Sequence, residues 1–170
     1  MKTLLLAAAL LAPCSFPFSL AAEGDFTEQG VTVSENRETK AWKVSDGTRS
    51  YEFQMPVKGK VCAAVDVPEW NTIFIGVQTS PTRFDILAVS KKDGKVSLVE
   101  LDQHYYADGH AFPLSPGDTI TLKSLKMETT PNGRALFTYP VIKYKGEYES
   151  ETGLSIKPLE DGTFQGWVNR

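Results

Sequence analysis

Both histidines of the chain, His104 and His110, lie in residues 102–117, together with two tyrosines and two prolines. Imidazole and phenol side chains offer large contact areas with polar tips, and they lose little rotamer entropy on binding. A His is also the usual base of a serine or cysteine hydrolase, and two His with an Asp can bind zinc or copper. The stretch is far longer than the two to five residues of a hairpin turn, so we expect a long loop.

The sequence leaves three interpretations of this loop open. In the first, Tyr105, Phe112 and Leu114 fold back over one end of the domain, and the histidines are ordinary surface groups. In the second, the loop enters a groove of a partner protein, and the contacts come from Gln103, His104, Tyr105, Tyr106, Asp108, Gly109, His110 and Ser115. In the third, His104, His110 and either Asp102 or Asp108 bind zinc or copper. The second underlies the function predicted below.

Motifs for catalysis and cofactors are absent from the sequence. It contains no Gly-x-Ser-x-Gly elbow, no His-Glu-x-x-His helix, no Gly-rich phosphate loop and no Cys pair for zinc. We therefore predict a protein that is not an enzyme and binds neither a metal nor a cofactor. A small secreted hydrolase centred on His104 or His110 is the least favoured alternative.

Alternating apolar residues predict strands around this loop. Tyr51, Phe53 and Met55 point one way within residues 49–55, which is the period of a half-buried strand. Further strands are expected at 60–67, 72–79, 83–90, 96–101, 119–125, 134–139, 141–144, 154–157 and 163–168. Turn residues recur every 8–12 positions, as in antiparallel sandwiches. The prediction is an all-β antiparallel sandwich of two packed sheets with little or no helix.

The other residues of chemical interest receive structural interpretations. Trp42, Trp70 and Trp167 are expected to pack in the core or at its edges, and Trp70 is the best placed of them for a glycan. Cys62 lies in an apolar run and is expected to be a buried, inert thiol. Lys91–Lys92 are interpreted as guards of a sheet edge.

Residues 1–21 are expected to be a secretory signal peptide. Nine Leu and Ala residues form Leu4–Ala12, and Ser19-Leu20-Ala21 supplies the small residues that a signal peptidase requires. A lipid anchor on Cys14 is the alternative. Residues 22–170 are predicted to form one β domain, in which 22–40 are loosely held apart from a strand at Val31–Glu35.

Composition excludes several classes of protein. The chain has 170 residues, two Cys, 41% hydrophobic residues and a net charge of −3. It is too apolar for a disordered chain and too poor in cysteine for a disulfide scaffold. Nucleic-acid binding requires a surplus of Lys and Arg, and a stable membrane span requires about 18 apolar residues in a row. We therefore expect neither nucleic acid nor stable membrane insertion.

In size, signal peptide and β character, the chain resembles small Gram-negative periplasmic enzyme inhibitors. These include lysozyme inhibitors and the immunity proteins that neutralise cell-wall-cleaving amidases of type VI secretion. The Ser-Gly-x-x-Tyr signature of one lysozyme-inhibitor family is absent, which favours the immunity kind. The resemblance implies a periplasmic or secreted protein whose loop, residues 103–116, enters the active site of a partner enzyme. The alternative is a glycan-binding β-sandwich module.

Overall fold

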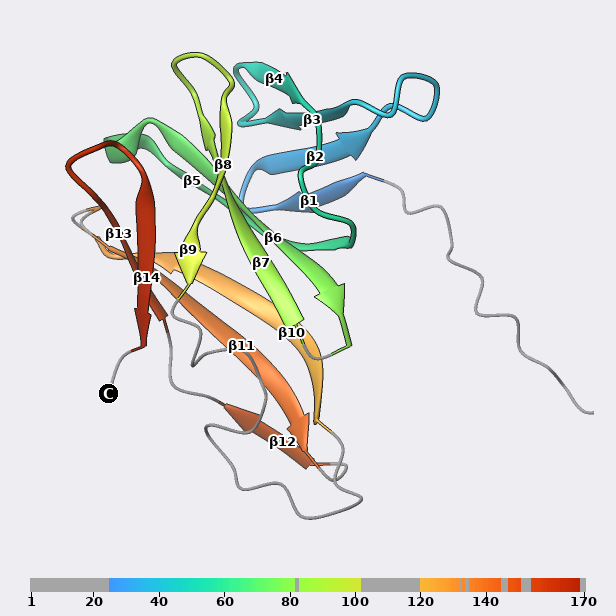
Figure 1. The fold of residues 1–170 in the computed structure, drawn as a ribbon, viewed down its shortest axis with the longest axis vertical. Coiled ribbons are helices and arrows are strands. Elements are labelled where there is room, and N and C mark those ends of the chain that lie inside the picture. The colour runs from blue at the N-terminus through green and yellow to red at the C-terminus, as the bar shows by residue number, and fades with distance from the viewer. Residues whose placement is uncertain are drawn as a thin grey trace, which may run out of the picture.

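The described residues form three β-sheets and one short 3-10 helix, η1 (Pro68–Trp70) (Figure 1). The structure, a computed structural model, describes residues 25–81, 83–101, 120–131, 133, 135–144, 147–150 and 154–168. The prediction of an all-β antiparallel sandwich with little helix is confirmed. The sequence led us to expect two sheets, whereas the structure stacks a third sheet on the outside of the pair.

The N-terminal sheet is an antiparallel meander in chain order. Its strands are β1 (Phe26–Glu28), β2 (Val31–Glu35), β3 (Trp42–Ser45) and β4 (Ser50–Phe53). Gln29 and Gly30 form the β1–β2 turn with φ of 48° and 79°, the positive pair that a tight two-residue hairpin requires. Strand β2 spans the residues expected for it, and Val31 and Val33 are buried. This is the strand expected within residues 22–40, which also contain β1.

The central sheet is a second antiparallel meander. Its strands are β5 (Lys60–Val67), β6 (Thr72–Ser80), β7 (Arg83–Ser90) and β8 (Val96–Leu98). The predicted turn at Asp93-Gly94 joins β7 to β8, and Gly94 has a φ of 71° there. In Figure 1 this green sheet lies between the blue strands of the N-terminal sheet and the orange and red strands of the C-terminal sheet.

The C-terminal sheet has the strand order β10-β11-β13-β14-β9, and β12 pairs with β11. Its strands are β9 (Glu100–Leu101), β10 (Ile120–Thr129), β11 (Leu136–Tyr144), β12 (Glu147–Ser150), β13 (Leu154–Pro158) and β14 (Phe164–Val168). All pairs are antiparallel except β14 with β9. Only Val99 separates β8 from β9, so the chain passes from one sheet directly into the next. Strand β11 runs through Pro140, where the sequence suggested two strands.

The main core lies between the central and C-terminal sheets. It consists of Ala63, Val65, Val67, Phe74, Phe84, Ile86, Ala88, Val99, Leu101, Leu125, Met127, Leu136, Leu154, Ile156 and Phe164. Gly76 of β6 allows the sheets to approach, since a Cβ there would lie 2.6 Å from Leu125 Cδ2. A side chain at this position would displace β10 from the central sheet.

The second core lies between the central and N-terminal sheets. It consists of Val31, Val33, Val44, Phe53, Val61, Ala64, Ile73, Ile75, Val77, Leu87 and Val89. Within β6, Ile73, Ile75 and Val77 face this second core, and Phe74 faces the main core, as their alternation predicts. The central sheet is therefore buried on both faces.

Strand β5 and strand β10 lie beside each other, and within the described residues no strand pairing joins them. The β1–β2 turn bridges their edges instead. The Glu28 carboxylate accepts a hydrogen bond of 2.9 Å from Ala64 N of β5, and Gln29 Nε2 donates one of 2.8 Å to Met127 O of β10. The N-terminal sheet thus satisfies backbone groups on both sides of this seam.

Thr138 of β11 provides a test of the main core. Its side chain is fully buried, and its Oγ1 has no hydrogen-bond partner in the described part of the chain. Because an unsatisfied buried hydroxyl costs about 1–3 kcal/mol, we expect Thr138→Val to raise the free energy of unfolding by about 1 kcal/mol in chemical denaturation.

Thr72→Val is the matched control for this prediction. Thr72 is also buried, but its Oγ1 donates a hydrogen bond of 2.8 Å to Trp70 O. The same substitution should therefore lower the free energy of unfolding by about 1 kcal/mol. Equal changes in the two variants would contradict the assignment of an unsatisfied hydroxyl to Thr138.

Candidate functional site

The predicted recognition loop lies outside the described residues. This applies to all of its candidate contact residues: Gln103, His104, Tyr105, Tyr106, Asp108, Gly109, His110 and Ser115. The structure describes the strands that end and begin on either side of it, namely β9, which ends at Leu101, and β10, which begins at Ile120.

The two flanking strands lie at opposite edges of the C-terminal sheet. Strand β9 pairs with β14 at one edge, and β10 is the strand at the other. Four strand spacings separate β9 from β10, which is about 19 Å measured across the strands. Residues 102–119 therefore join two edges rather than two neighbouring strands, so they are not a hairpin connection.

Strand β9 is held between the central sheet and β14. Leu101 is buried in the main core, and Val99 N donates a hydrogen bond of 2.8 Å to Ile86 O of the central sheet. Gly166 of β14 pairs with Leu101, and a Cβ at Gly166 would lie 2.9 Å from Leu101 Cδ2. The close approach of β14 thus depends on a residue without a side chain.

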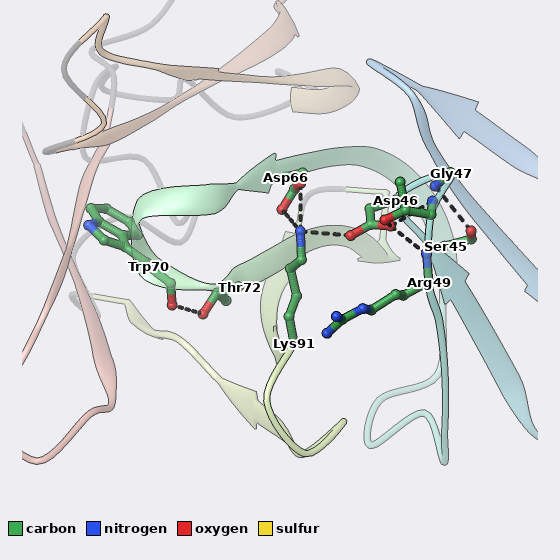
Figure 2. Close-up of polar contacts among 9 residues, drawn as sticks. Ser45, Asp46, Gly47, Arg49, Asp66, Trp70, Thr72 and Lys91 are labelled. Atoms are coloured by element: carbon green, nitrogen blue, oxygen red, sulfur yellow. Dashed lines mark hydrogen bonds and ion pairs between the residues drawn. The ribbon is translucent and has the colours of Figure 1, made fainter.

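A charged cluster joins the N-terminal and central sheets (Figure 2). Lys91 Nζ lies 2.7 Å from Asp46 Oδ2 and 2.9 Å from Asp66 Oδ2. The side chains of Lys91, Asp46 and Asp66 are 14%, 4% and 23% exposed, respectively. Ion pairs that are this shielded from solvent are screened less than surface pairs. Removal of one charged partner would therefore leave the others as shielded, unpaired charges, which is destabilising.

Local hydrogen bonds place each member of this cluster. Asp46 follows β3, and its Oδ1 accepts hydrogen bonds from the backbone N–H groups of Thr48 and Arg49, which orders the β3–β4 turn. Lys91 follows β7, and its backbone N donates a hydrogen bond of 2.8 Å to Asn71 O. Asp66 lies on β5. The cluster therefore ties three separate segments of the chain together.

The electrostatics of the cluster favour permanent charges. Hydrogen bonds from Lys91 and from the Arg49 and Thr48 groups hold the pKa of Asp46 well below its usual range. Burial of Lys91 opposes its charge, but the bonds to Asp46 and Asp66 outweigh burial and raise the pKa of Lys91. Both pKa values move away from neutrality, which suits a structural ion pair and not proton transfer.

The edge-guard interpretation is wrong for Lys91. Its ammonium is held by two aspartates inside a sheet-to-sheet contact, whereas Lys92 beside it is exposed. No sequence signal could have found this role, because Asp46, Asp66 and Lys91 lie far apart in the chain and only the fold brings them together.

The three tryptophans have different surroundings. Trp70 is half-buried, with ring centroids 5.8 Å from Phe74 and 5.6 Å from Phe164, and Trp42 packs on the second core. The packing expectation is therefore confirmed for these two. It is wrong for Trp167, which is 39% exposed on the outer side of β14.

Cys62 and the metal-ligand residues offer no further site in the described ranges. Cys62 is half-buried rather than buried, and its Sγ donates a hydrogen bond of 3.5 Å to Gly76 O. No three His, Cys, Asp or Glu side chains of the described residues are grouped as metal ligands. Within the same residues, no helix is long and apolar enough to cross a bilayer.

Comparisons with known proteins assign no family to the chain. No protein-family model, curated protein or solved structure matches it.

Lys91→Met tests the charged cluster. The variant leaves two shielded carboxylates without a counter-ion, so we expect the free energy of unfolding to fall by about 3 kcal/mol, measured by chemical denaturation. Lys92→Met is the control, and it should change the same quantity by less than about 0.5 kcal/mol. Equal stabilities of the two variants would rule out a stabilising cluster.

The acid stability of the protein should depend on Asp46. Because the pKa of Asp46 is lower in the folded than in the unfolded chain, its contribution is complete at neutral pH and is lost as the pH falls below about 4. Asp46→Asn should therefore be less stable than the wild type at pH 7, and the difference should shrink between pH 5 and pH 2.5 in denaturation curves.

Asp161→Asn is the control for this pH dependence. Asp161 also accepts hydrogen bonds from its own turn, from Thr163 N and Thr163 Oγ1, but it lies on an exposed turn without a lysine partner. These hydrogen bonds lower the pKa of Asp161 in the same direction, but without a lysine the stability difference between its variant and the wild type should be smaller than for Asp46→Asn. A constant difference between Asp46→Asn and wild type over this pH range would contradict the prediction.

Proposed function

We propose that the chain is an exported binding domain that inhibits a partner enzyme through residues 103–116. In this proposal Gln103, His104, Tyr105, Tyr106, Asp108, Gly109, His110 and Ser115 make the contacts. The domain acts in the periplasm or outside the cell after removal of residues 1–21. The partner is an enzyme that degrades the cell wall, and the chain is an immunity protein that neutralises it.

The observation that carries this proposal is the anchoring of the segment at opposite edges of one sheet. Strand β9 is held by the main core, and β10 is paired with β11 from Ile120 onward. A recognition segment attached to a rigid β scaffold loses less entropy on binding than a segment attached to mobile chain. The scaffold therefore suits a binding role for the residues between the two strands.

The composition of the segment indicates how it would inhibit. His and Tyr groups that enter an active site can form hydrogen bonds with the enzyme's nucleophile or with its catalytic His. Aromatic anchors at the centre of an interface provide most of the binding free energy. Pro113 and Pro116 restrict the chain before β10, which lowers the entropy lost on binding.

A replacement of equal length tests the proposal. Because β9 and β10 lie at opposite edges of the sheet, a short hairpin would strain the fold, so residues 103–116 are replaced by a Gly-Ser segment of the same length. The partner is captured from periplasmic and secreted fractions on the immobilised wild-type domain and identified by mass spectrometry. Its wall-cleaving activity is then measured with each domain added.

We expect the wild-type domain to inhibit this activity and the Gly-Ser variant to bind at least 100-fold more weakly. The control replaces the exposed turn at residues 36–40, between β2 and β3, by Gly-Ser and should inhibit like the wild type. If the variant altered at 103–116 captures and inhibits the same enzyme as well as the wild type, the proposal is wrong.

A further inference from the structure

The outer face of the C-terminal sheet carries a row of two aromatic residues and one serine that the proposed function does not use. Phe137 of β11, Ser155 of β13 and Trp167 of β14 are direct cross-strand neighbours. The residues before and after them along the strands, such as Leu136, Leu154 and Ile156, point into the main core. By the alternation of strands, the row therefore points away from the core, opposite to the sheet's buried face.

The two rings of the row lie on either side of a small polar residue. Phe137 is half-buried, Trp167 is 39% exposed, and Ser155 between them is 8% exposed. Two strand spacings place the backbones that carry the rings about 10 Å apart. Trp167 is one of two large hydrophobic side chains that are strongly exposed in the described ranges, the other being Leu98 on β8.

A cation lies over the exposed ring. Lys157 Nζ is 5.8 Å from the centroid of Trp167, within the range of a cation–π contact. Among the described residues, no ion pair joins Lys157 to an acidic side chain. Gln165, which pairs with Lys157 across the strands, adds an amide donor and acceptor beside the ring. A negative group on a ligand could therefore reach Lys157 while the ligand lies on Trp167.

Acidic residues limit the extent of this face. Glu128 pairs with Phe137 at the β10 end of the row, and Glu100 pairs with Gln165 at the β9 edge; both are exposed. Lys157 thus lies at the centre of the face, and the margin at β10 carries the exposed Lys126 as well as Glu128. This arrangement places a single anionic group of a ligand near Lys157 and disfavours a uniformly polyanionic surface.

We propose that the Phe137–Ser155–Trp167 row, with Lys157 and Gln165, binds a glycan in which neutral sugar rings separate the rings that carry a carboxylate. A pyranose ring presents a face of C–H groups that packs on an aromatic ring, whose face is electron-rich. One carboxylate pairs with Lys157, and a neighbouring sugar hydroxyl forms a hydrogen bond with the Gln165 amide. An open sheet face accommodates an extended chain of sugars, whereas small ligands bind in concave pockets.

The test uses two defined probes on the purified protein. Calorimetric titration compares a hexamer of alternating glucuronic acid and N-acetylglucosamine, which is acidic at every second ring, with a hexamer of N-acetylglucosamine, which is neutral. We expect the acidic hexamer to bind at least fivefold more tightly than the neutral one. Absence of binding by both sugars, or equal binding of the two, would overturn the proposal.

Variants assign the binding to this face. Trp167→Ala should weaken binding of the acidic hexamer by tenfold or more, while Trp167→Tyr retains most of the affinity and shows that the fold is intact. Lys157→Gln should remove the preference for the acidic hexamer. Leu98→Ala, which changes the other exposed hydrophobic residue, is the control and should bind like the wild type. Unchanged binding by Trp167→Ala would place the sugar elsewhere.

This inference and the proposed function can fail independently. The Gly-Ser replacement of residues 103–116 leaves the Phe137–Ser155–Trp167 row intact, so it should bind the acidic hexamer like the wild type. Conversely, Trp167→Ala should still inhibit the partner enzyme. If Trp167→Ala loses a captured protein and neither sugar binds the wild type, the row is a protein contact and the glycan site is refuted.

Discussion

Burial of the central sheet on both faces is the constraint on which the rest of the fold depends. Its strands carry apolar side chains in both directions, so neither the C-terminal sheet nor the N-terminal sheet alone could keep them from water. The main core explains why β9 to β14 close over one face. The second core explains why the first four strands must pack on the other.

A stack of sheets leaves strand edges and sheet contacts to be stabilised by polar groups. At the seam between β5 and β10, Glu28 and Gln29 supply a side-chain acceptor and donor to backbone groups that pair with no described strand there. At the other contact, Lys91 neutralises Asp46 and Asp66. Apolar burial drives the sheets together, and these directional contacts fix their relative positions, since buried polar groups require matched partners.

The sequence predicted the individual strands well and the number of layers poorly. Strands β5 and β7 have the predicted bounds, because each is an uninterrupted apolar run between turn residues. The third sheet could have been inferred from β6, where both Ile75 and Phe74 are apolar although they point to opposite faces. Strands β1 and β3 are three or four residues long, which is too short for a periodic pattern to be recognised.

The candidate site was predictable in part only. The composition of residues 102–117 marks them as unusual without any structure. The positions of Lys91 and Trp167 depend on packing between segments that are remote in the chain. Trp167 has the same residue type as Trp70, yet Trp70 packs on two phenylalanines and Trp167 does not, because strand alternation points Trp167 away from the core. Residue type alone cannot separate a core aromatic from a surface one.

The topology of the C-terminal sheet sets a minimum length for the segment between β9 and β10. The strand pairings place Leu101 level with Thr129, the last residue of β10, so the chain must cross about 19 Å and also run about 30 Å along β10 to reach Ile120. That distance, about 35 Å, requires roughly ten extended residues at 3.3–3.6 Å each. Residues 102–119 are 18 residues, somewhat less than twice that number. Connection of the two edges therefore explains why the segment is longer than a hairpin turn, but not why it is this long or why it holds both histidines. The excess length and the aromatic composition are what a binding role accounts for.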